Sequence, residues 1–325
     1  MKRSFSIIIF LCFIMIALLS GCSNNKKEIQ KQSEVLQTNY SYKKPIIPEG
    51  FHTVETETAR WEKQDDGTVE GWNSGLVIED DKGNQFVWVP CSVDEESETV
   101  KYGRYFSTHT EEGIKVENFE NKKIKHLTIK SNGEEYSYYE DDEKNEEIKK
   151  MVSKYGGFFI GRYELGYENE DVVVKRDCNP VVNIDKEQAV ELTSNIIQNK
   201  NVQTYLMTSF CYDTTIKWLE ESNKDFRENP VKYHNFIEDN NYEAKKTGES
   251  LDINNIYDII GNVAEITTEK YSGNLNTDKF VQRSGISKNM SNFSNKVILA
   301  DIFSQRGATK EKSKIIGTRA IIIIK

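Results

Sequence analysis

The sequence predicts an irregular α+β fold, with two main helices, short antiparallel strands and long loops, in one domain over residues 45–325. Two observations lead to this fold class. The first is that apolar runs of strand length alternate with polar, Gly- and Asn-containing stretches. The second is that helical periodicity is confined to a few segments. No tandem repeat of about 20–50 residues occurs in the sequence, which argues against a repeat architecture.

The expected strands are short. The first two apolar runs flank a turn that contains Gly83, and they therefore predict a strand pair. Ile321–Ile324 is the continuous apolar run of a strand that is buried on both faces. The apolar runs lie at 76–78, 86–89, 158–163, 172–174 and 321–324.

Helical spacing first occurs in the middle of the chain. Ile148, Met151, Val152 and Tyr155 follow the i, i+3, i+4, i+7 pattern, and the glycines at 156–157 predict the end of that helix.

Two further helices are expected after it. Asp185 and Gln188 have the spacing of a capping box, which opens a helix. A longer helix is expected at about 209–222, because Tyr212, Ile216 and Leu219 fall on one face. Helical patterns largely cease beyond this segment.

Residues 92–147 are acidic and sparse in apolar side chains, and we interpret them as an insertion with a hairpin at 131–133. The acidic cluster at the end of this stretch does not have the spacing of an EF-hand calcium loop. It is typical of the solvated start of a helix.

Composition limits the function classes. The chain has 325 residues, with 43 Lys and Arg against 52 Asp and Glu, and its formal net charge is −9. This balance argues against a nucleic-acid partner, because phosphate binding requires a basic footprint. The hydrophobic fraction of 37% excludes a multi-span membrane protein, and the aromatic fraction of 11% argues against wholesale disorder.

The N-terminus has the pattern of a secreted, lipid-anchored protein. Lys2 and Arg3 precede an apolar run at 7–19 that fits a signal-peptide core and is short for a spanning helix. The run ends in Leu-Ser-Gly-Cys at 19–22, which resembles a bacterial lipobox and implies cleavage before Cys22 and lipidation of its thiol. An uncleaved anchor helix is the alternative.

The lipobox defines the organisation that follows. Residues 1–21 are the expected signal peptide, and the polar stretch 22–44 is the expected tether between lipid and domain. The membrane is then a partner through the lipid, and the domain faces the extracellular side of the cell membrane. Its acidic charge predicts that the domain stands off an anionic surface.

The remaining cysteines are Cys91, Cys178 and Cys211. An odd number allows one disulfide at most, and whether any two of them pair is left open. Their spacing does not suggest zinc, so we interpret them as small apolar residues in strands and a helix.

Five segments, in order, resemble the formylglycine-generating-enzyme (sulfatase-modifying-factor) family, a branch of the C-type-lectin fold. Their order resembles in particular an extracellular subgroup from clostridial-type bacteria, with a PIIPEGF-like opening before the domain. The fourth segment is the most specific. The segments are FVWVP at 86–90, GGFFIGRYELG at 156–166, YLMTSFCYDTTIKWL at 205–219, NIYDIIGNVAEIT at 255–267 and GTRA at 317–320.

The resemblance implies a calcium site at the turn around Gly261. Family members often hold the ion there through backbone carbonyls and one carboxylate, which corresponds to the carbonyls of Asn262 and Val263 with the side chain of Glu265. The alternative is that Glu265 forms a local cap or ion pair. The family's Trp after Val263 is Ala264 in this chain.

The family's oxidase chemistry is not expected. It requires two thiols that bind copper(I), and the matching positions hold about Asn289 and Ser294, with no cysteine after Cys211. We therefore expect no copper and a pseudoenzyme with respect to formylglycine formation. The four histidines, at 52, 109, 126 and 234, lack the spacing of the related iron enzymes.

Three functional readings stay open. In the first, the domain is a surface module that binds an unknown glycan or protein through 287–295, whose small polar residues surround apolar anchors. In the second it is an enzyme of unrecognised type, for example with a reactive Cys211. In the third it is a purely structural envelope lipoprotein. The candidate ligand contacts are Arg283, Asn289, Met290, Asn292 and Phe293.

Overall fold

The computed structural model describes residues 42–56, 62–63, 69–70, 72–94, 96–110, 113–119, 126–131, 134–140, 142–235, 243–272, 279–284 and 307–325. Ser41–Lys325 forms a compact unit. The predicted signal peptide, Cys22 and the tether up to residue 41 lie outside the described residues. Within the described part of the chain, no helix is long and apolar enough to cross a membrane.

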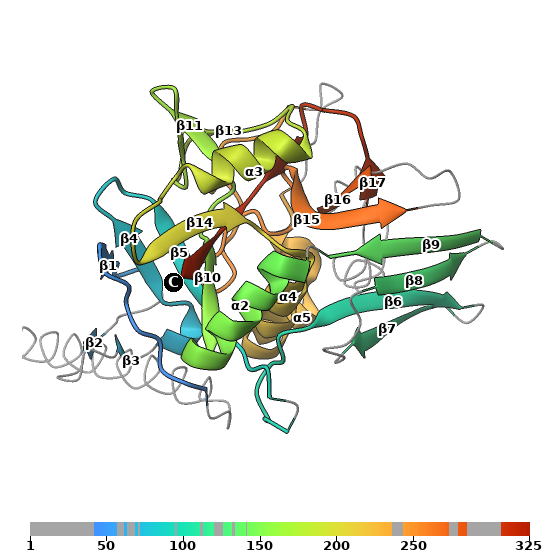
Figure 1. Cartoon of the computed structure of the whole chain (residues 1–325), viewed down its shortest axis with the longest axis horizontal. Coiled ribbons are helices and arrows are strands. Elements are labelled where there is room, and N and C mark those ends of the chain that lie inside the picture. The colour runs from blue at the N-terminus through green and yellow to red at the C-terminus, as the bar shows by residue number, and fades with distance from the viewer. Residues whose placement is uncertain are drawn as a thin grey trace, which may run out of the picture. The chain divides into compact units, whose positions relative to one another are not determined.

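One six-stranded sheet lies at the centre of the fold, and its neighbouring strands are all antiparallel (Figure 1). The predicted strand pair around Gly83 is confirmed as β4 and β5, and the predicted buried strand is confirmed as β19. The strand order is β1 (Phe51–Thr53), β4 (Val77–Asp80), β5 (Gln85–Pro90), β10 (Gly157–Gly161), β19 (Ala320–Ile324) and β14 (Val202–Leu206).

The central strands of this sheet divide the apolar core into two clusters. Phe158, Ile160 and Ile321 belong to one cluster, whereas Phe159 and its cross-strand partner Ile322 belong to the other. Successive strand residues point to opposite faces of a sheet. An unbroken apolar run is therefore what a strand covered on both faces requires.

The predicted helices are all present. The capping box is confirmed, because the Gln188 amide donates to Asp185 Oδ1 at 2.9 Å and the Asp185 amide donates to Gln188 Oε1 at 3.2 Å. The helices are α2 (Asp142–Tyr155), α3 (Lys186–Ser194), α4 (Ser209–Ser222) and the short α5 (Lys224–Glu228), with 3-10 turns η1 (Trp72–Ser74) and η2 (Pro230–Tyr233).

A second sheet contains the two strands that precede and follow the predicted ligand contacts in the sequence. Its outer pair, β8 and β9, confirms the predicted hairpin, because Ser131 faces Glu134 in register. Strand β18 (Ile316–Thr318) pairs in parallel with the central strand β15. The strand order is β17 (Gly307–Thr309), β16 (Lys279–Arg283), β15 (Ala264–Ser272), β9 (Glu134–Tyr139) and β8 (His126–Ser131).

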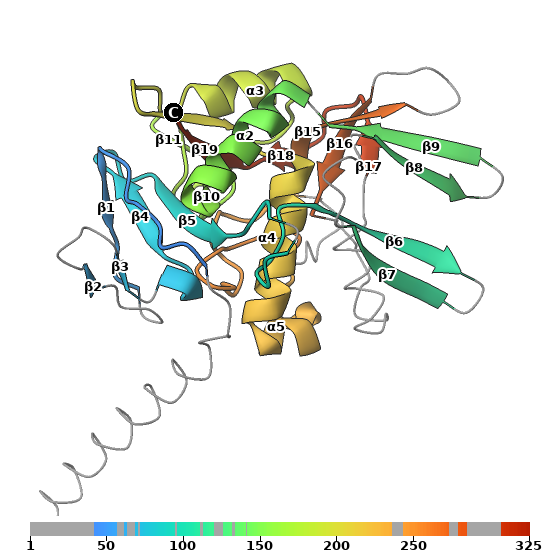
Figure 2. The same cartoon turned by 60° about the horizontal axis from the view of Figure 1, so that its bottom comes forward.

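The predicted insertion contains more regular structure than expected. Besides β8 and β9 it forms a second hairpin, and both hairpins extend on the same side of the molecule (Figure 2). The described chain is thus a mixed structure of mostly antiparallel strands and few helices, which confirms the α+β class. The remaining strands are β2 (Glu62–Lys63), β3 (Val69–Glu70), β6 (Arg104–Thr110), β7 (Gly113–Phe119), β11 (Gly166–Glu168), β12 (Asp171–Val173) and β13 (Asn179–Pro180).

Candidate functional site

Arg283 is the predicted ligand contact that the structure describes. It is the last residue of β16, and its side chain is 0% exposed. A direct ligand contact requires an exposed side chain, and this burial argues against Arg283 as such a contact. The other predicted contacts, Asn289, Met290, Asn292 and Phe293, lie outside the described residues.

The guanidinium of Arg283 is buried because it has a buried counter-charge. It forms an ion pair with Asp213 of α4, and it lies over the ring of Tyr212 at 4.5 Å from the ring centroid. Helix α4 is buried along most of its length, so a carboxylate at 213 needs an internal partner. The ion pair thus fixes the end of β16 to α4.

The chain leaves the second sheet immediately after this ion pair. Gln282 of β16 and Gly307 of β17 are cross-strand partners, so the strand residues on either side of the 285–306 stretch lie next to each other on this sheet. Loops on a rigid scaffold carry a disproportionate share of binding residues. The predicted ligand contacts beyond Arg283 all belong to this stretch.

A second buried ion pair lies at the start of α4. Arg104 of β6 pairs with Glu269 of β15, and the Ser209 hydroxyl donates to Glu269 Oε2 at 2.6 Å. The carboxylate of Glu140, just after β9, accepts the Ser209 amide at 2.9 Å and the Thr268 hydroxyl. A carboxylate at a helix N-terminus is favourable because the helix dipole is positive there.

The predicted calcium turn is held by two buried carboxylates. Glu164 accepts the Asn262 side-chain amide at 2.7 Å and the Val263 backbone amide at 3.1 Å. Glu265 forms an ion pair with Arg319, 2.7 Å between Oε1 and Nη2. Glu265 thus forms an ion pair, as in the alternative, but with a residue 54 positions away and not with a local one.

Arg319, from the GTRA segment, ties three parts of the chain together. Its Nε donates to Glu265 at 2.8 Å, and its two terminal nitrogens donate to the carbonyls of Gly161 and Tyr257, each at 2.9 Å. The second oxygen of Glu265, Oε2, is buried and has no hydrogen-bond partner. Burial raises the pKa of the Glu265 carboxyl, while Arg319 acts in the opposite direction.

Glu164 is a site residue that sequence reasoning misses. It is fully buried, and burial, with Asp258 and Glu265 nearby, holds the pKa of its carboxyl well above the usual range. The available signal is that Arg162 and Glu164 interrupt an apolar run from 158 to 165. Charged residues inside such a run are almost never buried without partners.

Replacing Gly261 by Val is expected to lower the free energy of unfolding by about 2–4 kcal/mol. Gly261 has a φ of +91°, and an added Cβ would lie 2.5 Å from the carbonyl oxygen of Asn235. Gly50 is the matched control, because it has a φ of +90° and open space around it. The Gly50→Val variant should lose only about 1–2 kcal/mol in urea denaturation. Equal losses in the two variants would contradict the steric argument.

The described cysteines, Cys91, Cys178 and Cys211, are free and buried. Burial raises the pKa of the Cys211 thiol to about 12, and it raises the pKa of Cys91 well above its ordinary value. The thiolate is the nucleophile, so a thiol of this kind is inert near neutral pH.

Iodoacetamide at pH 8 is expected to label Cys178 at least about tenfold faster than Cys211 in the folded chain. Burial raises the pKa of both thiols, to about 12 for Cys211, but Cys178 is 7% exposed whereas Cys211 is 0% exposed. Peptide mapping by mass spectrometry resolves the two rates. Labelling in denaturant should remove the difference, and equal rates in the folded chain would mean that Cys211 is accessible.

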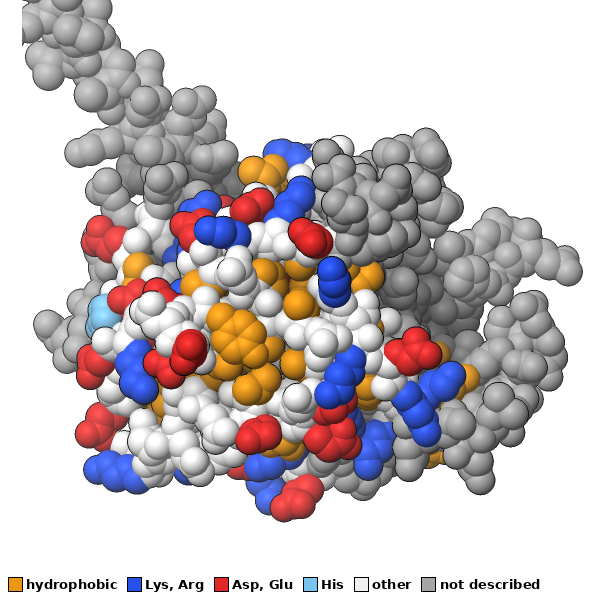
Figure 3. Space-filling view, turned by 90° about the horizontal axis from the view of Figure 1, so that it is seen from above, with side chains coloured by type: hydrophobic (Ala, Val, Ile, Leu, Met, Phe, Trp, Pro, Cys, Tyr) orange, Lys and Arg blue, Asp and Glu red, His pale blue; other side chains and the backbone are white. Residues whose placement is uncertain are grey.

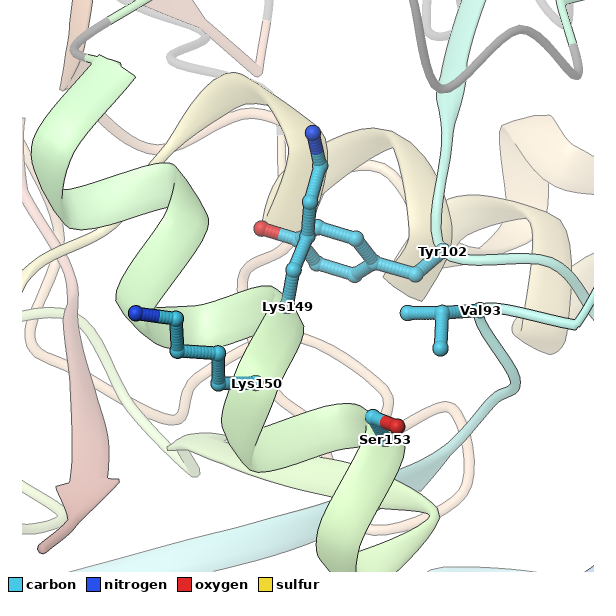
Figure 4. Close-up of a pocket in the computed structure, with 5 residues that line it drawn as sticks. All are labelled: Val93, Tyr102, Lys149, Lys150 and Ser153. Atoms are coloured by element: carbon cyan, nitrogen blue, oxygen red, sulfur yellow. The ribbon is translucent and has the colours of Figure 1, made fainter.

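A small cavity of about 170 Å³ lies beside α2 (Figure 4). The Tyr102 ring and the Val93 side chain face it, while the Lys150 amine points away from both. The Tyr102 hydroxyl donates to Asn145 at 2.8 Å, which fixes the ring. The volume is below the roughly 300–1,000 Å³ of typical small-molecule sites. The cavity is lined by Val93, Tyr102, Lys149, Lys150 and Ser153.

No family model and no curated protein matches this sequence. Among solved structures, Treponema denticola variable protein 1 aligns with a TM-score of 0.32 and 13% sequence identity. The alignment covers 61% of this chain and 99% of that chain. At this TM-score and sequence identity, the alignment supports no conclusion about the fold or the function of the chain.

Proposed function

We propose that residues 45–325 form a C-type-lectin-like domain of the formylglycine-generating-enzyme type that has no oxidase activity and binds a ligand. The ligand, a glycan or a protein, would contact the stretch after Arg283. The observation that carries this proposal is the cross-strand pair of Gln282 and Gly307, which brackets that stretch on a rigid sheet. The buried ion pair of Arg283 with Asp213 supports it, because it fixes the strand end from which the stretch departs.

The proposed location is the extracellular side of the cell membrane. The support is the lipobox-like segment that ends at Cys22, after a charged and then apolar start. Lipidation of Cys22 would tether the domain through the polar residues that follow it. Metabolic labelling with an alkyne fatty acid should mark the chain, and a Cys22→Ser variant should lose the label.

The enzyme reading remains the second candidate, because Glu164 is a buried carboxyl with a raised pKa. Both of its oxygens, however, accept hydrogen bonds from the turn at 262–263, as expected of a structural carboxylate. The inert thiol of Cys211 weighs against cysteine chemistry. The binding reading is therefore the one that the geometry supports best.

Calcium binding at the Glu265 turn is part of the proposal. Glu265 Oε2 is a buried carboxylate oxygen with no hydrogen-bond partner, and oxygen ligands of this kind suit Ca²⁺. Millimolar Ca²⁺ should raise the melting temperature over EDTA, and Mg²⁺, which prefers octahedral sites, should raise it less. The same melting temperature in Ca²⁺ and EDTA would exclude the site.

The ligand proposal is tested with the full chain in detergent micelles on an array of glycans and peptidoglycan fragments. Selective binding should be lost in the Asn289→Ala/Phe293→Ala variant. The control is Leu251→Ala/Gln198→Ala, which removes one exposed apolar and one amide side chain elsewhere. No binding on the array would remove the glycan ligand and leave protein partners. Binding that survives in the loop variant would place the site elsewhere.

A further inference from the structure

A groove of about 460 Å³ lies on the face that carries α3 and the β11–β12 hairpin. Its walls come from this hairpin, the β4–β5 turn and the C-terminal end of α3, which are far apart in the sequence. Seen from this side of the molecule, hydrophobic side chains gather between charged ones (Figure 3). The volume falls within the roughly 300–1,000 Å³ of small-molecule sites.

The groove is held rigid by hydrogen bonds between its walls. Asn84 of the β4–β5 turn accepts the Val174 amide at 2.9 Å, and the Gln85 amide donates to the Val174 carbonyl at 3.0 Å. Asn84 is itself held by Asp80, 2.9 Å between the amide nitrogen and the carboxylate. A site whose walls are fixed before binding loses little entropy on binding.

The tip of the hairpin carries a strained glutamate that faces the groove. Glu168 and Asp171 are cross-strand partners, so Asn169 and Glu170 form a two-residue turn with φ of 51° and 72°. Such a turn strongly prefers Asn followed by Gly, and Glu stands in the glycine position. Strain of this kind is found mostly where a side chain has a function.

The charged side chains that line the groove carry a net negative charge. Lys175 is paired with Glu168 at 2.5 Å, so the other charged groups that line the groove are two carboxylates, Glu170 and Asp171, and one amine, Lys82. Among the residues that the structure describes, the carboxylates of Glu170 and Asp171 form no ion pair or hydrogen bond. A cationic group is therefore favoured in the groove.

Apolar side chains lie next to these polar groups. Val172 and Leu192 line the groove, and Asn195 adds an amide at its edge. Tyr167 is 44% exposed and lies directly opposite Val172 in register, so its ring is on the same face of the hairpin. A single ligand with hydroxyl groups, an apolar C–H face and a positive charge could bind the amide, the apolar side chains and the carboxylates of the groove together.

We propose that this groove binds a saccharide that carries a free amino group. The ammonium lies against Glu170 and Asp171, the hydroxyls bond to Asn195 and the carboxylates, and the apolar ring face packs on Val172 and Leu192. None of the residues that line the groove belongs to the stretch after Arg283, and the proposal does not rest on the ligand proposed there.

The test is calorimetric titration of the full chain in micelles with a glucosamine trimer and with its N-acetylated form. We expect the glucosamine trimer to bind at least about tenfold more tightly, because acetylation removes the positive charge. Absence of binding at millimolar trimer, or equal binding of the two trimers, would overturn the proposal.

The decisive variant is Glu170→Gly. It removes the carboxylate and also relieves the positive φ, so we expect an unchanged or higher melting temperature together with at least about a tenfold loss of affinity. Glu249→Gly, an exposed carboxylate outside the groove, is the control and should keep the affinity. A second variant, Asn195→Trp, should block the groove. Affinity that survives Glu170→Gly but is lost in Asn289→Ala/Phe293→Ala would assign the sugar to the C-terminal stretch and overturn the groove site.

Discussion

Replacing Asp213 by Ala is expected to lower the free energy of unfolding by about 3–5 kcal/mol. The change removes the carboxylate that faces the guanidinium of Arg283, and both side chains are 0% exposed. A charge left in the interior without its counter-charge is costly, because it has lost its hydration as well. Urea denaturation followed by circular dichroism measures the loss.

Two comparisons isolate the ion pair from other effects of the substitution. Lys224→Ala breaks an exposed pair with Glu228, 3.7 Å between the charged atoms, and should cost about 1 kcal/mol or less. Asp213→Ala/Arg283→Met removes both charges and should be more stable than Asp213→Ala alone. A double variant that is less stable than the single one would mean that Arg283 contributes mainly through its other contacts.

Arg319→Met is expected to have a still larger effect, about 5 kcal/mol or more. It breaks the buried pair with Glu265 and also leaves the carbonyls of Gly161 and Tyr257 without their donor. These acceptors belong to segments that are distant in sequence, so the loss affects β10, the 255–265 turn and β19 together. Arg319→Lys keeps the positive charge but cannot donate to all three acceptors at once, so its loss of unfolding free energy should be smaller than that of Arg319→Met.

The Arg319→Met variant should also change the pH dependence of stability. Without Arg319, the pKa of Glu265 is expected to rise further, because burial already raises it and the opposing cation is gone. The folded chain then binds a proton that the unfolded chain has lost, so stability increases as the pH falls toward the unfolded carboxyl pKa of about 4.3. Unfolding at pH 5 and pH 8 should therefore show a smaller deficit at pH 5. A deficit that does not depend on pH would contradict this role for Glu265.

Local patterns were sufficient to predict the elements whose signals lie within one segment. Thr208 caps α4 through the Cys211 amide, and the apolar spacing behind it fixed the helix at 209–222. The short helix α5 was missed because five residues show no period. The pairing of β9 with β15 could not be predicted either, because it joins strands more than a hundred residues apart.

The site was predictable only in part, for a related reason. The resemblance of the 255–267 segment to the family marked the turn, whereas its buried partners Glu164 and Arg319 become visible only in the structure. Arg283, in contrast, was a candidate ligand contact, and nothing in the sequence around it indicates that its side chain is buried. Its burial depends on Asp213, which is 70 residues away and whose inward position only the packing of α4 determines.

The 104–140 segment, which carries two hairpins, is joined to the rest of the domain by buried charged residues at its two ends. The segment begins at Arg104 and ends at Glu140, and these residues contact Glu269 and Thr268, which are neighbours on β15. Excision of the segment would take away a cation from a fully buried carboxylate and an acceptor from the first amide of α4. The two end residues, Arg104 and Glu140, are thus the part of the segment that the domain requires. A related chain that lacks them should carry an uncharged residue at the position of Glu269.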